Sequence, residues 1–304
     1  MRTKMLKEGI VVHGGAGAPP SMSDGCEAAV KAGLKVFGKG KPALDAAIAA
    51  VISMEDDGRF NAGSGSVLRL DGKSIEMDAG VMDSKGILGA VASVHHVRNP
   101  VVLARRVAET PHIFLAGDGA VAFARACGLY TRQQRPTAQS RRYHKRLLEA
   151  LRNKKADMLR PDWLNFDLQR YWNLKTPYER IFEKTDTVGA VALSADGVFA
   201  VAGSTGGAAP MLRGRIGDTP IIGSGFYAGP HGAVAATGIG EEIMRRTLSL
   251  QVYTWIAEGL SPQAACERGV KLMPKKMPAG LIAIGKRGYG IAANVPMACH
   301  VVVE

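Results

Sequence analysis

A threonine at the start of an apolar run offers one way to build a hydrolase. Thr187 follows the polar segment 184–186 and opens the run 187–193, which is small, β-branched and apolar and therefore predicts a buried strand. A threonine hydroxyl needs a base to take its proton, and cutting the chain just before the threonine would supply its own α-amine. That amine has an ordinary pKa of roughly 7.7–8.0, so no distant histidine is required. The short motif alone is weak, because any threonine opening a strand would produce it.

A second threonine is expected to face Thr187 across a hairpin. The runs 187–193 and 198–204 flank an Asp-Gly pair, which is typical of a tight turn. Thr205 follows the second run, eighteen residues after Thr187, so paired strands would bring the two hydroxyls together. Thr205 would then orient the nucleophile, unless it is an ordinary strand threonine.

An arginine and an aspartate three residues apart could recognise an amino acid. Arg215 and Asp218 lie in the glycine-rich stretch 214–225. The rigid guanidinium fork suits a carboxylate, and an aspartate suits the ammonium group beside it. Together they would bind an amino-acid zwitterion, and the alternative is a surface ion pair.

The order of these motifs resembles the N-terminal-nucleophile (Ntn) hydrolases of the plant-type asparaginase and isoaspartyl aminopeptidase family. Glycosylasparaginase and threonine aspartase are cousins in that group. The resemblance spans nearly the whole chain except about residues 131–183, and six segments carry it: 12–17 (VHGGAG), 60–65 (FNAGSG), 184–193, 203–207 (GSTGG), 214–225 and 236–241 (ATGIGE).

The resemblance implies an amidohydrolase that activates itself by cutting its own chain. Thr187 would form an acyl-enzyme and hydrolyse L-asparagine to aspartate and ammonia, β-aspartyl (isoaspartyl) peptides, or both. A glycosylasparaginase or a protease like threonine aspartase is the alternative in the same class. An uncut, inactive relative that binds polyanions is the alternative in another class.

The resemblance also assigns roles to further residues. Thr237, through its hydroxyl, and Gly238, through its backbone N–H, would stabilise the oxyanion. Asn61 would hold the freed amine, and Gly240 would accept a hydrogen bond from the substrate ammonium. As an ordinary strand threonine, Thr237 would have no chemical role.

The cut implied by the resemblance lies between Asp186 and Thr187. Residues 1–186 would form an α subunit with a mobile basic tail over 131–186, and residues 187–304 a β subunit, both within one folded domain. A homodimer of precursors would give an (αβ)2 heterotetramer. Plant-type members usually have glycine before the nucleophile and often histidine before that, whereas this chain has Thr185 and Asp186.

The resemblance implies a structural sodium ion but no cofactor for catalysis. The ion would be held by backbone carbonyls of the predicted loop 55–65 and the residue before it. The carbonyl ligands implied are those of Met54, Glu55, Asp57, Phe60, Ala62 and Ser64. The acidic pair in this loop lacks the spacing of a calcium-binding EF-hand.

Positive charge is concentrated in one segment. The chain carries a net charge of +12, and residues 131–160 hold 10 Lys/Arg against 2 Asp/Glu. The sequence predicts a basic helix over 141–152. We favour a solvated connection over an arm that binds nucleic acid, because the segment contains no nucleic-acid-binding motif.

Targeting and cysteine patterns predict a cytoplasmic enzyme without a membrane partner. No run approaches the ~18 apolar residues of a membrane helix, and the apolar start at residues 10–12 is too short for a signal peptide. The four cysteines lack metal spacing and read as free thiols: Cys26, Cys127, Cys266 and Cys299.

The segments that must position these residues are predicted to be strands, several of them paired in hairpins, with helices between them. The predicted strands are 8–13, 67–70, 74–83, 86–94, 112–115, 187–193, 198–204, 232–237, 280–284, 289–294 and 298–303. The predicted helices are 26–37, 42–54, 100–109, 119–127, 141–152, 241–259 and 262–272. His13, at the end of the first strand, reads as structural. This pattern favours an α+β fold with two antiparallel sheets between helical layers, the αββα sandwich that the resemblance also implies.

Overall fold

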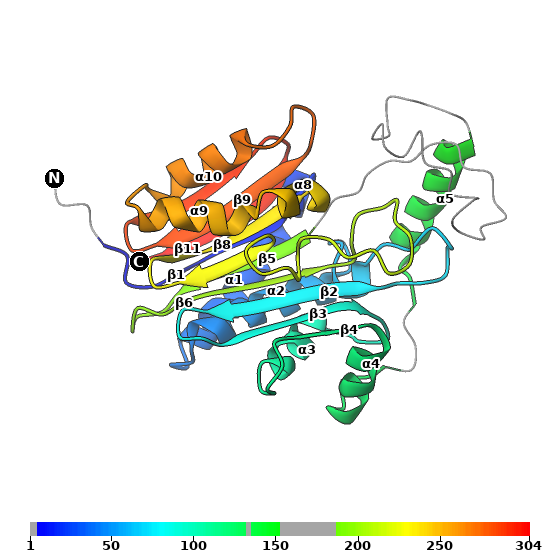
Figure 1. Cartoon of the computed structure of the whole chain (residues 1–304), viewed down its shortest axis with the longest axis horizontal. Helices are drawn as coiled ribbons and strands as arrows, with labels where there is room; N and C mark the ends of the chain where they lie inside the picture. The colour runs from blue at the N-terminus through cyan, green and yellow to red at the C-terminus, as the bar shows by residue number, and fades with distance from the viewer. Residues whose placement is uncertain (1–4, 132–134, 153–186) are drawn as a thin grey trace.

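Two β-sheets packed face to face form the centre of the computed structural model, which describes residues 5–131, 135–152 and 187–304 (Figure 1). The larger sheet has the order β11-β1-β5-β6-β2-β3-β4 and is antiparallel except for the β3–β4 pair. Its strands are β1 (Gly9–Ala16), β2 (Met77–Asp83), β3 (Leu88–Val94), β4 (Phe114–Ala116), β5 (Thr187–Leu193), β6 (Phe199–Thr205) and β11 (Met297–Val303). The smaller sheet, in the order β10-β9-β8-β7, contains β7 (Phe226–Gly229), β8 (Gly232–Gly238), β9 (Ala279–Gly285) and β10 (Gly288–Ala293).

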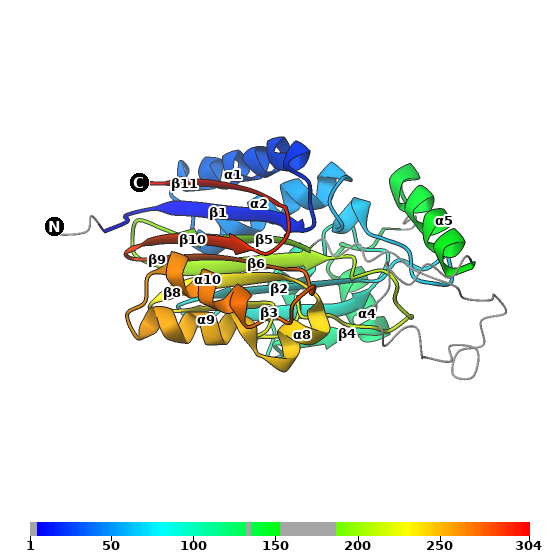
Figure 2. The same ribbon diagram turned by 90° about the horizontal axis from the view of Figure 1, so that it is seen from above.

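Helices cover the outer face of each sheet. The larger sheet packs against α1 (Ser23–Phe37), α2 (Ala43–Asp57) and α3 (Pro100–Val107), and α4 (Gly117–Ala126) lies beside β3 and β4. The smaller sheet packs against α9 (Leu248–Ala257) and α10 (Pro262–Lys271), while the short α8 (Gly240–Arg245) follows β8. The described residues also include two short 3-10 helices, η1 (Pro20–Met22) and η2 (Gly63–Gly65). These four layers confirm the predicted α+β sandwich (Figures 1 and 2).

The hairpin that carries the candidate nucleophile is buried on both faces. Every residue of β5 and β6 is buried, since α2 covers one side and the smaller sheet covers the other. Strands buried on both faces lose the polar alternation of a surface strand, which is why the predicted run is continuously apolar. The two strands pair in register, and Gly197 at the turn adopts a positive φ of 82°.

The first three residues of the predicted loop 55–65 and the predicted strand 67–70 were wrong. Residues 55–57 belong to the last turn of α2, which ends at Gly58 in a left-handed conformation with φ 77°. Residues 67–70 form no strand, because the Leu70 N–H donates to Met211 of a distant loop. Asp71 then closes a local turn by accepting hydrogen bonds from the backbone of Lys73 and Ser74.

The second half of the chain differs from prediction in two places. The single helix predicted over 241–259 is two helices, α8 and α9, because Thr247 adopts a left-handed conformation with φ 43° between them. Strand β7 was not predicted. It is only four residues long and contains two small residues, so its sequence carries little periodic signal.

The predicted basic helix is confirmed as α5 (Ala138–Arg152), which lies at the end of the sandwich opposite the C-terminus (Figures 1 and 2). Most of the predicted tail and the pair Thr185-Asp186 lie outside the described residues. The four cysteines are all free. Among the helices of the described residues, none has the length and apolar character needed to cross a membrane.

Candidate active site

Two threonine hydroxyls face each other at one edge of the larger sheet. Thr187 is the first residue of β5 and is 8% exposed, and its register partner is Thr205 at the end of β6. Thr187 Oγ1 lies 3.3 Å from Thr205 Oγ1. The Gly207 N–H donates to Thr205 Oγ1 at 3.0 Å, which fixes this oxygen next to Thr187. The predicted juxtaposition is therefore present.

Asn61 supports the turn that follows Thr205. Its side-chain amide donates to the Gly207 carbonyl, and its Oδ1 accepts from the Val67 N–H at 3.0 Å. The Gly206 N–H donates to the Asn61 carbonyl at 2.8 Å. A side chain at Gly206 would collide with Asn61 Oδ1, so glycine is required for this close approach. Asn61 thus fixes the turn that directly follows Thr205.

Thr237 reaches the same edge from the smaller sheet. It is fully buried near the end of β8, and its Oγ1 accepts a hydrogen bond of 3.1 Å from the N–H of Ala16. Ala16 ends β1, and β1 pairs with β5 so that its C-terminal end lies beside the start of that strand. Because the Thr237 oxygen acts as acceptor toward Ala16, its O–H can still donate to another group.

Gly238 has a backbone that other residues rarely adopt. Its φ is 137°, and an added Cβ would lie 2.2 Å from the carbonyl oxygen of Pro278. A side chain at this position would therefore displace the end of β8 that carries Thr237.

Asp218 is buried and Arg215 is mostly buried, so the two do not form a surface ion pair. The Arg215 side chain is 17% exposed and donates two hydrogen bonds of 3.0 Å to the Glu241 carboxylate of α8. Asp218 is 3% exposed. A Cβ on Gly240 would lie 2.8 Å from Asp218 Oδ1 and 2.9 Å from Arg215 Nη2, so Gly240 lies directly against both groups. The predicted recognition residues are brought together, and Glu241 is an additional member.

Acidic groups in this cluster are harder to ionise than usual. Burial raises the pKa of Asp218 to about 7, the Arg215 charge opposes this, and the nearby Glu241 and Asp78 carboxylates reinforce it. Burial also raises the pKa of Asp78, although Arg69 opposes the shift. An ammonium ion placed here would be stabilised by ionised Asp218.

His13 fits a structural role. Its ring is fully buried, and burial lowers its pKa to about 3, while contact with the Thr187 backbone acts in the opposite direction. The ring therefore stays neutral near pH 7. A Cβ on Gly189 would lie 2.3 Å from His13 Nε2, so the histidine fills the space that this glycine leaves open.

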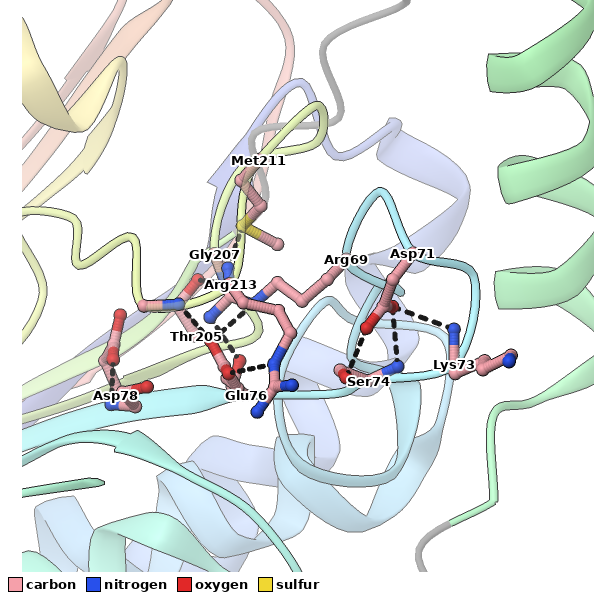
Figure 3. Close-up of polar contacts among 12 residues, drawn as sticks. Arg69, Asp71, Lys73, Ser74, Glu76, Asp78, Thr205, Gly207, Met211 and Arg213 are labelled. Carbon is pink, nitrogen blue, oxygen red and sulfur yellow. Dashed lines mark hydrogen bonds and ion pairs between the residues drawn. The ribbon is translucent and has the colours of Figure 1, made fainter. Parts of the chain in front are cut away.

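Sequence reasoning missed a group of buried charges near Thr205 (Figure 3). Arg69 and Glu76 form an ion pair with an Nε to Oε2 distance of 3.2 Å, and Asp78 lies directly across from Thr205 in the β2–β6 register. The sequence signal for this group was the presence of charged residues inside apolar segments. Charged residues are almost never fully buried unless they are paired, so their presence there predicts buried ion pairs.

Three of the residues whose carbonyls are expected to hold sodium, Met54, Glu55 and Asp57, lie in the last turn of α2, and the other three lie in the segment that follows it. The last carbonyls of a helix lack intrahelical partners and carry partial negative charge, which favours a cation. The Glu55 carbonyl accepts a 2.8 Å hydrogen bond from Ser64 Oγ, and the Ala62 carbonyl accepts one of 3.0 Å from the Gly65 N–H, so the loop folds back onto the helix end. In the described part of the chain, no three His, Cys, Asp or Glu residues cluster as metal ligands.

Comparisons of the sequence with known proteins match this chain over almost its full length. The profile of the asparaginase family matches residues 6–301. The chain is 40% identical over 302 residues to the plant-type L-asparaginase of Pyrococcus abyssi, covering 94% of this chain and 92% of the relative. It is 40% identical over 293 residues to the plant-type L-asparaginase of Pyrobaculum calidifontis, covering 92% and 91%. It is 37% identical over 300 residues to the isoaspartyl peptidase/L-asparaginase of Homo sapiens, covering 93% and 88%.

Proposed function

This chain belongs to the asparaginase family, and from that premise we propose that it hydrolyses L-asparagine, β-aspartyl peptides, or both, through an N-terminal threonine. The observation that carries the proposal is the Thr187 hydroxyl, held 3.3 Å from the Thr205 hydroxyl at the first residue of a buried strand.

Cleavage between Asp186 and Thr187 would free the base that the mechanism needs. The new α-amine takes the proton of the Thr187 hydroxyl while Oγ1 attacks the amide carbonyl. The amine then gives that proton to the leaving nitrogen, so that ammonia or a peptide amine departs. Water hydrolyses the remaining ester and releases aspartate. Thr205 keeps the attacking oxygen oriented, and Asn61 would hold the amine.

The oxyanion and the substrate ends would be bound by separate groups. The Thr237 O–H and the Gly238 N–H stabilise the oxyanion. Arg215 binds the α-carboxylate with the guanidinium edge that Glu241 leaves free, and Asp218 binds the α-ammonium together with the Gly240 carbonyl. Only the aspartyl half is recognised, so the leaving group can be ammonia or a peptide.

Residues 1–186 and 187–304 would be the two subunits of one domain, and two precursors would assemble into an (αβ)2 heterotetramer. The test is denaturing gel electrophoresis and intact mass spectrometry, together with an ammonia assay on asparagine and an aspartate assay on a β-aspartyl dipeptide. We expect fragments of about 20 and 12 kDa from the 32.1 kDa chain, and hydrolysis of one or both substrates. An uncut chain without activity would instead favour a relative that binds polyanions through residues 131–160.

A structural sodium ion would be held by the carbonyls of Met54, Glu55, Asp57, Phe60, Ala62 and Ser64. Its role would be to fix the loop that carries Asn61, and the chemistry would need no cofactor. An ion that binds only the folded state raises the melting temperature. We therefore expect a higher Tm in sodium chloride than in choline chloride at equal ionic strength, measured by calorimetry, and identical values would contradict this site.

A Thr237→Val variant should cut itself normally yet turn over slowly. Loss of one oxyanion donor raises the barrier by about 2.7–4 kcal/mol, so kcat should fall about 10²- to 10³-fold. Thr237→Ser keeps the hydroxyl and should retain most activity. Thr254→Val on α9, whose hydroxyl donates to the Leu250 carbonyl of its own helix, is the matched control. Steady-state kinetics with a kcat like that of the control would exclude Thr237 from this role.

The rate should depend steeply on pH on the acid side. Asp218, with its pKa raised to about 7, must be ionised to bind the substrate ammonium. The Thr187 α-amine, with an ordinary pKa of roughly 7.7–8.0, must be unprotonated to act as base. Both requirements fail as the pH falls, so the logarithm of kcat/KM should approach a slope of about two below neutrality, whereas kcat should show a slope of about one. A slope of one in both plots would show that Asp218 does not titrate near neutrality in the free enzyme, which would contradict its raised pKa.

A further inference from the structure

We propose that the buried pair of Arg69 and Glu76 is a positioning element for the active site. The pair holds the loop 206–214 near both of its ends. Thr205 precedes that loop and Arg215 follows it. The inference rests on the proposed function, because that function gives Thr205 and Arg215 their roles.

Arg69 holds the first part of the loop. Its side chain is 0% exposed and extends toward Thr205 and Met211 (Figure 3). Nη1 contacts the Met211 sulfur and lies 2.9 Å from the position that a Gly207 Cβ would take. The Gly207 N–H is the group that donates to Thr205 Oγ1. A shift of Arg69 would therefore be transmitted through Gly207 to the Thr205 hydroxyl, which faces Thr187.

Glu76 holds the last part of the loop. Its Oε2 accepts a hydrogen bond of 2.7 Å from the N–H of Gly214, the residue immediately before Arg215. The same carboxylate is 3.2 Å from Arg69 Nε, and Arg69 Nη2 also donates to the Glu76 carbonyl at 2.9 Å. Arg213 approaches Glu76 from the solvent side at 3.5 Å, with 64% of its side chain exposed. The buried contact with Arg69 therefore joins the two loop ends, and the Arg213 contact lies at the rim.

The environment of Arg69 argues against a purely stabilising role. Burial lowers the pKa of Arg69, with Asp78 and Glu76 opposing that shift. A buried ion pair is often no more stabilising than an apolar pair of similar volume, so the pair is weak evidence for stability. The planar guanidinium of Arg69 contacts the Met211 sulfur, the Glu76 carbonyl and the Glu76 carboxylate at the same time, so it fixes their relative positions.

The test separates positioning from stability by removing the pair together. Arg69→Met alone leaves the buried Glu76 carboxylate without its main partner and should lower the Tm. Arg69→Met combined with Glu76→Gln removes both charges and keeps an oxygen acceptor for Gly214, so its Tm should return toward that of the unmodified enzyme. Both variants should lose kcat about ten- to a hundredfold, because small misplacements near the reacting atoms have effects of that size. Arg213→Gln is the matched control, and its kcat should change less than about twofold.

Kinetics are expressed per active site, counted by mass spectrometry of the cut chain, so incomplete self-cleavage does not imitate a slow enzyme. A low kcat in the double variant despite a recovered Tm supports positioning, and a kcat that recovers with the Tm overturns it. If Arg69→Met does not fold, Arg69→Lys is the deciding variant, because it keeps the positive charge but lacks the planar guanidinium. A tenfold or greater loss of kcat in Arg69→Lys supports the proposal, and a normal kcat overturns it. Failure of the unmodified enzyme to hydrolyse either substrate would instead reject the proposed function.

Discussion

A Thr187→Ala variant is expected to remain one chain of 32.1 kDa and to release no measurable ammonia from asparagine. The variant removes the hydroxyl that would break the backbone before residue 187 and would later attack the substrate, so both reactions stop together. Removing a nucleophile typically lowers kcat by about 10⁴-fold or more, which places the residual rate below detection.

Thr187→Ser is the matched control, because it keeps both a hydroxyl and, once cut, an α-amine on the same residue. We expect it to be cut and to be active, though more slowly, since the Thr187 methyl group is packed in a buried strand. Denaturing gels and an ammonia assay on both variants suffice. Ammonia production by uncut Thr187→Ala would refute the mechanism.

The second large effect is expected at Arg215. Arg215→Gln should lower kcat/KM about 10²- to 10³-fold, mainly through KM, because a buried charged contact to the substrate carboxylate is lost. Arg215→Lys should recover only part of this, since lysine cannot bind Glu241 and the substrate carboxylate with one planar fork.

The loss should be the same for asparagine and for a β-aspartyl dipeptide, because both present the same aspartyl end. Arg213→Gln, two residues away and exposed, is the control for surface charge in this loop. A variant that loses only one substrate would show that Arg215 binds the leaving-group side instead.

The sequence predicts the parts of this fold that have clear periodicity. The β5–β6 hairpin and the facing positions of Thr187 and Thr205 follow from two apolar runs around an Asp-Gly turn, and the structure confirms them. The start of α2 was predicted from Pro42. Its predicted end at residue 54 was too early, because the acidic last turn up to Asp57 resembles a loop in composition.

Interactions between distant segments account for the remaining errors. Residues 67–70 look like a strand, yet the Leu70 N–H is bound by Met211, which is 141 positions away. The same segment contains Arg69, and because it was predicted as a strand, the buried position of the Arg69 charge near the site was not predicted. The pairing of Arg215 with Glu241 across 26 positions was likewise invisible, because no local pattern joins a glycine-rich loop to a short helix.

The strand order of the larger sheet limits how the two proposed fragments could ever come apart. β1, β2, β3 and β4 precede Thr187 in sequence, whereas β5, β6 and β11 begin at or after it, and the order β11-β1-β5-β6-β2-β3-β4 interleaves them. β1 is hydrogen-bonded on both sides by strands of the other fragment. Dissociation of the fragments would therefore require melting of the domain, and neither fragment could keep this sheet alone. Size-exclusion chromatography of cut and uncut protein should give the same elution volume.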